Sequence, residues 1–63
     1  MSKARALYRD YYIDLEEDAQ LWRVAAIMHR ITGQTLLPPG FNYADRATVE
    51  QYAKAAIDLQ VAD

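Results

Sequence analysis

The chain has 63 residues, a formal net charge of −2 and no cysteine. A chain of this length forms one domain at most, and as a monomer it would bury only about 60% of the surface that its unfolded form exposes. Disulfide bonds and thiolate metal sites are excluded, and the one histidine, His29, cannot hold a structural zinc ion alone. Oligomerisation remains as a source of stability, so we expect a homodimer.

The charge pattern argues against nucleic acid and membranes as partners. The basic residues near the N-terminus, Lys3, Arg5 and Arg9, are followed at once by an acidic run over residues 10–18. No apolar run is long enough to cross a bilayer, and the N-terminus lacks the apolar core of a signal peptide. We therefore expect a cytoplasmic protein that binds neither nucleic acid nor membrane.

The first half of the chain has the pattern of one long helix. Residues 2–32 contain no proline or glycine, and Gly33 is the first residue suited to a left-handed helix end. A helix of that length would be roughly 45 Å long. Asp14 and Glu17 have the spacing of a capping box, so the helix is either continuous or broken near Asp14.

Apolar residues fall on two faces of this predicted helix, which means that it must be packed from two sides. One side would contact the second half of the chain. The other side is predicted to be the dimer interface, formed by Leu15, Ala19, Trp22 and Ala26.

The second half is predicted to be an irregular connector followed by a shorter helix. In the connector, Pro39 and Gly40 suit a type II turn, and the apolar residues Leu36, Leu37 and Phe41 are expected to cap the core. The second helix is predicted over residues 45–61. The predicted fold class is thus all-α: an antiparallel helical hairpin, a single domain over residues 1–63, that pairs into a homodimeric helix bundle.

Residue patterns typical of catalysis or metal binding are missing from the sequence. His29 has no suitable nucleophile partner, and the acidic run lacks the glycine and the oxygen spacing of a calcium-binding loop. We predict no enzymatic activity, no cofactor, no metal and no small-molecule ligand.

The tyrosines give the strongest positive signal for function. A second helix of about 17 residues spans roughly 25 Å and cannot cover the start of the first. Tyrosine and arginine are frequent in binding hot spots, so the sequence predicts a partner-binding surface there. The alternative is that the tyrosines form the dimer core, and the partner site would then be sought near Phe41, Tyr43 and Arg46. The predicted partner-binding residues are Tyr8, Arg9, Tyr11 and Tyr12.

These features favour a small, non-enzymatic protein-interaction module. We expect an adaptor or antagonist of the kind encoded by bacteriophages or mobile elements, which modulates a larger host protein such as a transcription regulator or an ATPase. The alternatives are a small DNA-binding regulator that uses Lys3, Arg5 and Arg9, or a structural or assembly component.

Overall fold

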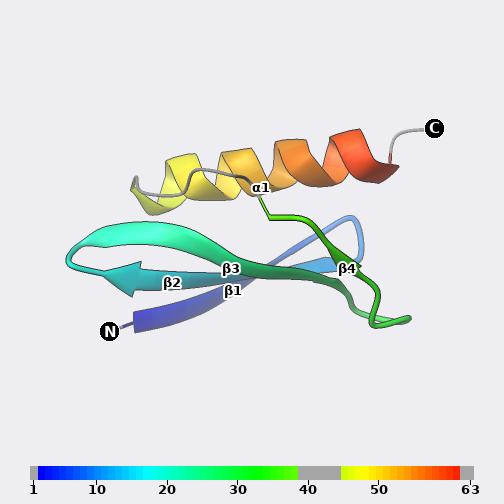
Figure 1. Cartoon of the computed structure of the whole chain (residues 1–63), viewed down its shortest axis with the longest axis horizontal. Coiled ribbons are helices and arrows are strands. Elements are labelled where there is room, and N and C mark those ends of the chain that lie inside the picture. Colours follow the sequence, from blue (N-terminus) through cyan, green and yellow to red (C-terminus); the bar gives the residue numbers. More distant parts are fainter. Residues whose placement is uncertain (1, 39–44, 62–63) are drawn as a thin grey trace.

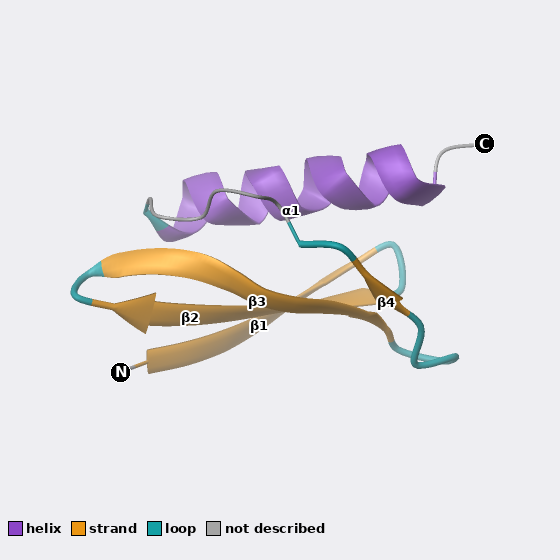
Figure 2. Cartoon of the chain, in the orientation of Figure 1, coloured by secondary structure: helices purple, strands orange, loops and turns teal. Residues whose placement is uncertain are grey.

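The computed structural model describes residues 2–38 and 45–61. Its strands form one antiparallel sheet in the order β1-β2-β3-β4, and a single helix, α1, packs on one face of that sheet (Figure 1). Figure 2 shows the resulting two layers, strands below and helix above. The elements are β1 (Ser2–Tyr8), β2 (Tyr11–Asp18), β3 (Leu21–His29), β4 (Thr35–Leu36) and α1 (Arg46–Val61).

The predicted all-α helical hairpin, and the helix bundle built from it, are therefore wrong. The segment expected to be one helix over residues 2–32 forms three strands joined by two tight turns. The shorter helix expected over residues 45–61 is present, because α1 covers Arg46–Val61. Gly33 does have a positive φ of 76°, but it lies between β3 and β4 and does not end a helix.

The first two hairpins, β1–β2 and β2–β3, close with two-residue turns that contain no glycine. Arg9 and Asp10 have φ values of 51° and 66°, and Ala19 and Gln20 have 55° and 66°. Positive φ at both central residues defines a type I′ turn, whose twist matches that of the flanking strands. Glycine, asparagine and aspartate adopt this conformation most readily. Only Asp10 belongs to that group, so the sequence carries little sign of either turn.

The pattern of buried residues in β2 shows why this segment forms a strand rather than a helix. Tyr11, Ile13 and Leu15 are buried beneath α1, and the residues between them are half-buried on the opposite face. Alternation at every second residue places this apolar set on one side of a strand, whereas a helix would distribute it around its axis. The aromatic and β-branched residues of β2 also favour strands over helices.

The helix completes the core with one side chain per turn. Val49, Ala53 and Ile57, spaced four residues apart, are at most 1% exposed. Residues four apart share a helix face, so all three point to the sheet. Their buried partners on the strands are Tyr11, Ile13, Leu15, Val24 and Ile27.

Asp45 caps the N-terminus of α1. Its carboxylate accepts hydrogen bonds from the Thr48 hydroxyl at 2.5 Å and from the Thr48 backbone N–H at 3.4 Å. These hydrogen bonds, led by the one from the hydroxyl, lower the pKa of Asp45 because they favour its charged form. The cap explains why this helix was visible in the sequence: an N-cap residue precedes a regular apolar spacing.

The connector is only partly described. Pro39, Gly40 and Phe41, and hence the predicted type II turn, lie outside the described residues. Leu36 packs against the core as expected, whereas Leu37 is 78% exposed. Within residues 2–38 and 45–61, no helix has the length and apolar character needed to cross a membrane.

The turn between β2 and β3 gives a direct test of this fold. Replacing Ala19 by asparagine and Gln20 by glycine should stabilise the protein by about 1 kcal/mol or more, because both new residues accept positive φ. The measurement is urea denaturation followed by circular dichroism. Both native side chains are exposed, so the exchange removes no core packing.

The same double substitution in the middle of a helix would have the opposite sign. Glycine alone would cost about 1 kcal/mol there, and asparagine would add to the loss. A destabilised variant would therefore contradict the two-residue turn. The same exchange inside a helix could be made at two exposed positions of α1, as Ala55→Asn and Asp58→Gly. Asp58 is less suitable, because its carboxylate accepts a hydrogen bond from Tyr8 of β1 and that contact would also be lost. Ala55→Gly alone, in α1, should show the helical cost.

Candidate functional site

One face of the sheet is covered by α1, and no described residue forms a layer over the other, which we call the open face (Figure 2). The strand register places its side chains in three rows that cross β1, β2 and β3. One row is apolar and the other two are mainly charged. The rows are Leu7–Tyr12–Met28, Arg5–Asp14–Ala26 and Lys3–Glu16–Arg23.

Arg5 lies at the centre of the open face and contacts residues on the neighbouring strand. Its guanidinium forms two hydrogen bonds with Asp14 on the neighbouring strand, Nε to Oδ1 at 2.7 Å and Nη2 to Oδ2 at 3.3 Å. The same guanidinium lies over the Tyr12 ring, 4.6 Å from its centre. The bond from Arg5 to Asp14 raises the pKa of Arg5, which therefore stays charged. Arg5 therefore contacts both Asp14 and the Tyr12 ring.

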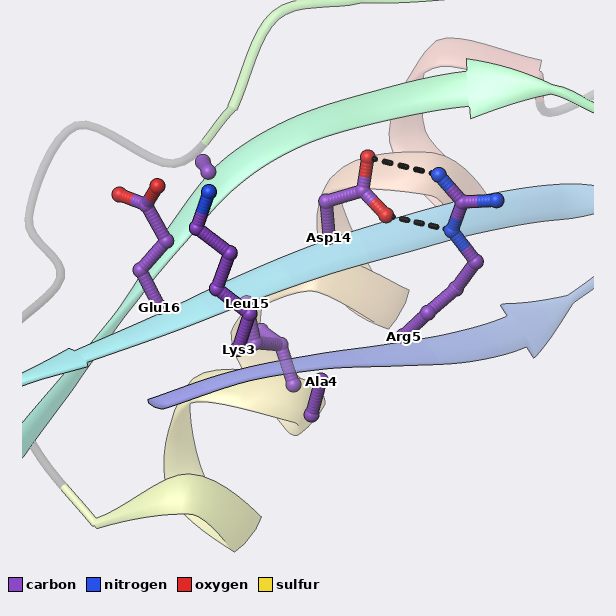
Figure 3. A pocket seen from close by; sticks show the side chains of 7 residues that line it. Lys3, Ala4, Arg5, Asp14, Leu15 and Glu16 are labelled. Atoms are coloured by element: carbon purple, nitrogen blue, oxygen red, sulfur yellow. Dashed lines mark hydrogen bonds and ion pairs between the residues drawn. The ribbon is translucent and has the colours of Figure 1, made fainter. Parts of the chain in front are cut away.

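A shallow hollow of about 460 Å³ lies beside this cluster (Figure 3). It forms where β3 carries only the small side chain of Ala25, near the register shift between Asp14 and Leu15 of β2. Lys3 and Glu16 extend side by side from neighbouring strands at its rim (Figure 3). The hollow therefore offers both signs of charge, on a surface that is open to solvent. Its lining residues are Lys3, Ala4, Arg5, Asp14, Leu15, Glu16 and Ala25.

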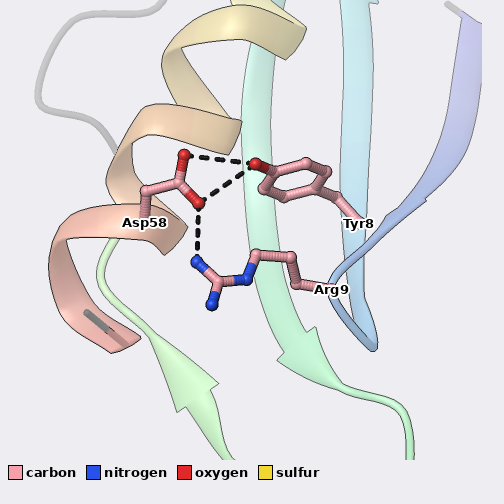
Figure 4. A network of polar contacts seen from close by, with 3 residues as sticks. All are labelled: Tyr8, Arg9 and Asp58. Atoms are coloured by element: carbon pink, nitrogen blue, oxygen red, sulfur yellow. Dashed lines mark hydrogen bonds and ion pairs between the residues drawn. The ribbon is translucent and has the colours of Figure 1, made fainter. Parts of the chain in front are cut away.

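The turn between β1 and β2 is bound to the C-terminal half of α1 (Figure 4). The Tyr8 hydroxyl donates to both carboxylate oxygens of Asp58, at 3.0 and 3.1 Å, and Arg9 Nη1 donates to Oδ1 at 2.9 Å. Lys54 lies over the Tyr8 ring at 5.6 Å. These residues attach the first hairpin to the helix.

The structure brings the four predicted partner-binding residues to one hairpin but divides them between its two faces. Tyr11 is 7% exposed in the core, and Tyr8 and Arg9 contact α1. Tyr12 alone points to the open face. The helix reaches Tyr8, so the predicted overhang of an uncovered tyrosine cluster is not present.

The four residues predicted as a dimer interface do not share a surface either. Leu15 is 1% exposed in the core, and Trp22 packs against the core from the helix side. Ala19 lies in the exposed turn between β2 and β3, and Ala26 is paired with Asp14 of the open face.

Sequence reasoning missed Arg5, Leu7 and Met28 as neighbours of Tyr12, because strand pairing is not visible in a helical interpretation. The signal that could have found them is the alternation of β1 and β2 on either side of a two-residue turn. Among the residues predicted as the alternative partner site, Arg46 lies over the Trp22 ring, 5.4 Å from its centre. Phe41 and Tyr43 lie outside the described residues.

Within the described part of the chain, no three histidine, aspartate or glutamate side chains are grouped to hold a metal ion. His29 has a structural position at the end of β3. Its Nδ1 accepts the backbone N–H groups of Ile31 and Thr32, both at 3.2 Å, and its ring meets the Tyr11 ring edge-on at 4.9 Å.

Comparisons of the chain with family models, with curated proteins and with solved structures gave no significant match. The function must therefore be inferred from the surface that the fold presents.

The contact between Tyr8 and Asp58 gives a prediction for the titration of Tyr8. Its pKa is raised, first by the hydrogen bond that it donates to Asp58. The folded pKa lies above the unfolded value of about 10, so the stabilisation is complete below that pH and is lost as the pH rises through the folded pKa. NMR of the five tyrosine rings should show Tyr8 losing its proton above the usual value.

The matched variants are Asp58→Asn and Asp18→Asn. The first should lower the titration midpoint of Tyr8, and the second, at an exposed position far along β2, should leave it unchanged. An unchanged Tyr8 midpoint in Asp58→Asn would show that Tyr8 does not donate a hydrogen bond to Asp58 in solution.

Proposed function

We propose that this protein is a small, non-enzymatic interaction module that acts as an adaptor or antagonist by docking on a larger protein through the open face of its sheet. The observation that carries the proposal is the composition of this face. Leu7, the last residue but one of the edge strand β1, is 58% exposed, and it lies in one apolar row with Tyr12 and Met28. Tyr12 is half-buried beside Arg5, and tyrosine and arginine are enriched in binding hot spots.

The charges of the open face favour a protein over a nucleic acid. Of its three cations, Arg5 and Arg23 each form an ion pair with a carboxylate on β2. Lys3 makes no ion pair with any residue of the described ranges. Arg9, the third cation of the predicted DNA contact, lies on the helix side with Asp58. Tight duplex binding needs several phosphates neutralised at once, and one unpaired lysine cannot supply that.

The partner that suits this face has apolar side chains at one end and acidic ones at the other. Apolar groups would cover Leu7, Tyr12 and Met28, and a carboxylate would neutralise Lys3. Arg5 and Asp14 already satisfy each other, so the middle of the face can be covered without leaving a buried charge unpaired. The chemistry is therefore that of a mixed protein surface.

The test is site-specific photocrosslinking in a lysate of the source cells. A benzophenone amino acid replaces Tyr12 in one variant and Tyr52, which is 39% exposed on α1, in the control. We expect a protein adduct from position 12 that is absent from position 52. Equal labelling at both positions, or none at position 12, would contradict docking through the open face.

Point variants measure the energy of the same contact. Leu7→Ser and Tyr12→Ala should each weaken capture of the crosslinked partner by about 1–2 kcal/mol, with circular dichroism unchanged. Tyr11→Ala is the contrasting variant, because it removes a core side chain and should unfold much of the protein. A position-12 adduct with a second copy of the chain would instead identify this face as a dimer interface.

A further inference from the structure

The size of the open face suggests that it is not the whole contact. Three strands of seven to nine residues cover an area of roughly 26 Å by 14 Å, or roughly 370 Å². A standard interface removes about 800 Å² of accessible surface from each partner. Side-chain relief adds to the accessible area of the face, but the face is still small compared with the surface that a standard interface buries on one partner. A partner would gain by continuing onto an adjoining surface.

The edge of β1 adjoins the open face and has backbone groups available for pairing. Among the described residues, β1 pairs with β2 alone, and it lies at the margin of the sheet in Figure 1. Tyr8 and Tyr11 flank a two-residue turn, so they exchange backbone hydrogen bonds. Alternation then directs the N–H and C=O groups of Lys3, Arg5 and Leu7 away from β2, toward the free edge.

The side chains of β1 leave room for an added strand on the helix side. Ala4 and Ala6 are the residues that point there, and both are only partly buried. Helix α1 contacts mainly β2 and β3, so these partly buried alanines form a margin beside it. Side chains of an added strand could pack on this margin without displacing any part of the core.

The charges along β1 determine what kind of strand would pair there. Lys3 and Arg5 lie on its open-face side, and Lys54 of α1 lies over Tyr8 on the other. Antiparallel pairing of two β1 strands would bring these cations together, and like charges on facing strands are destabilising. An acidic strand would meet the opposite charge of Lys3, which makes no ion pair within the described ranges, and would add a second carboxylate to Arg5 beside Asp14.

We propose that the free edge of β1 binds an extended, acidic segment of the partner protein by strand addition. The proposal rests on the proposed function and names how the partner extends its contact beyond the open face. The added strand places carboxylates opposite Lys3 and Arg5 and apolar side chains on Ala4 and Ala6. Main-chain hydrogen bonds to Lys3, Arg5 and Leu7 supply the pairing.

The test uses ¹⁵N-labelled protein and two synthetic nine-residue peptides with blocked ends. One peptide alternates valine with glutamate, and the other alternates valine with lysine. Without peptide, the amides of Lys3, Arg5 and Leu7 should exchange faster with solvent than those of Ala4 and Ala6. The glutamate peptide should slow that exchange and bind at least about tenfold more tightly than the lysine peptide.

A pair of variants separates the backbone contact from the charge. Arg5→Pro and Arg5→Thr both remove the guanidinium, but only proline also removes the outward N–H, and proline is tolerated on an edge strand. Arg5→Pro should bind the glutamate peptide about tenfold more weakly than Arg5→Thr. If proline disturbs the fold, Lys3→Glu provides the second test, because it should weaken the glutamate peptide and strengthen the lysine peptide.

The remaining outcomes overturn the proposal in distinguishable ways. Unprotected β1 amides together with a position-12 crosslink would retain docking on the open face and reject strand addition. Equal binding of both peptides would reject the acidic partner. If the amides of Lys3, Arg5 and Leu7 exchange more slowly as the protein concentration is raised, the edge of β1 pairs with a second copy of the chain. Loss of the position-12 crosslink, with the β1 edge still protected by peptide, would instead reject the open face.

Discussion

The burial of one helix stripe on the two central strands is the interaction on which the rest of the structure depends. Val49, Ala53 and Ile57 are the only helix side chains in the buried core of the described residues. Helix α1 is a single rod of 16 residues, so it covers one face of the sheet and, on that face, mainly β2 and β3. The open face and the free edge of β1 both follow from that limit.

The sequence could predict the helix but not the sheet. Asp45 and the spacing of Val49, Ala53 and Ile57 are local signals, and they gave the helix within one residue of its observed start. The strands needed two reversals of the chain, and those reversals use Arg9–Asp10 and Ala19–Gln20. Three of these four residues pay a steric penalty at positive φ, which the pairing of the strands must offset. The absence of glycine was therefore not evidence for a helix.

The candidate site was predictable in its residue types and not in its arrangement. The cluster of tyrosines with an arginine does lie at one place, because the turn at Arg9 brings Tyr8 and Tyr11 together. A strand sends neighbours to opposite faces, so Tyr11 is core and Tyr12 is surface. The sequence left two interpretations open, dimer core or partner surface, and the structure places Tyr11 in the core of the chain itself and Tyr12 on the open face. The long-range contact from Tyr8 to Asp58 has no sequence signal at all.

The placement of charge on the edge strand opposes pairing of two copies of β1. Lys3 and Arg5 lie on the edge strand, and a charged edge opposes growth of the sheet by a second β1. Arg5 is at the same time satisfied by Asp14 and stacked on Tyr12. It can therefore be covered by a partner without first losing another contact. The same residue thus opposes a like-charged strand at the edge and lies over the aromatic ring of the open face, so one side chain affects both surfaces.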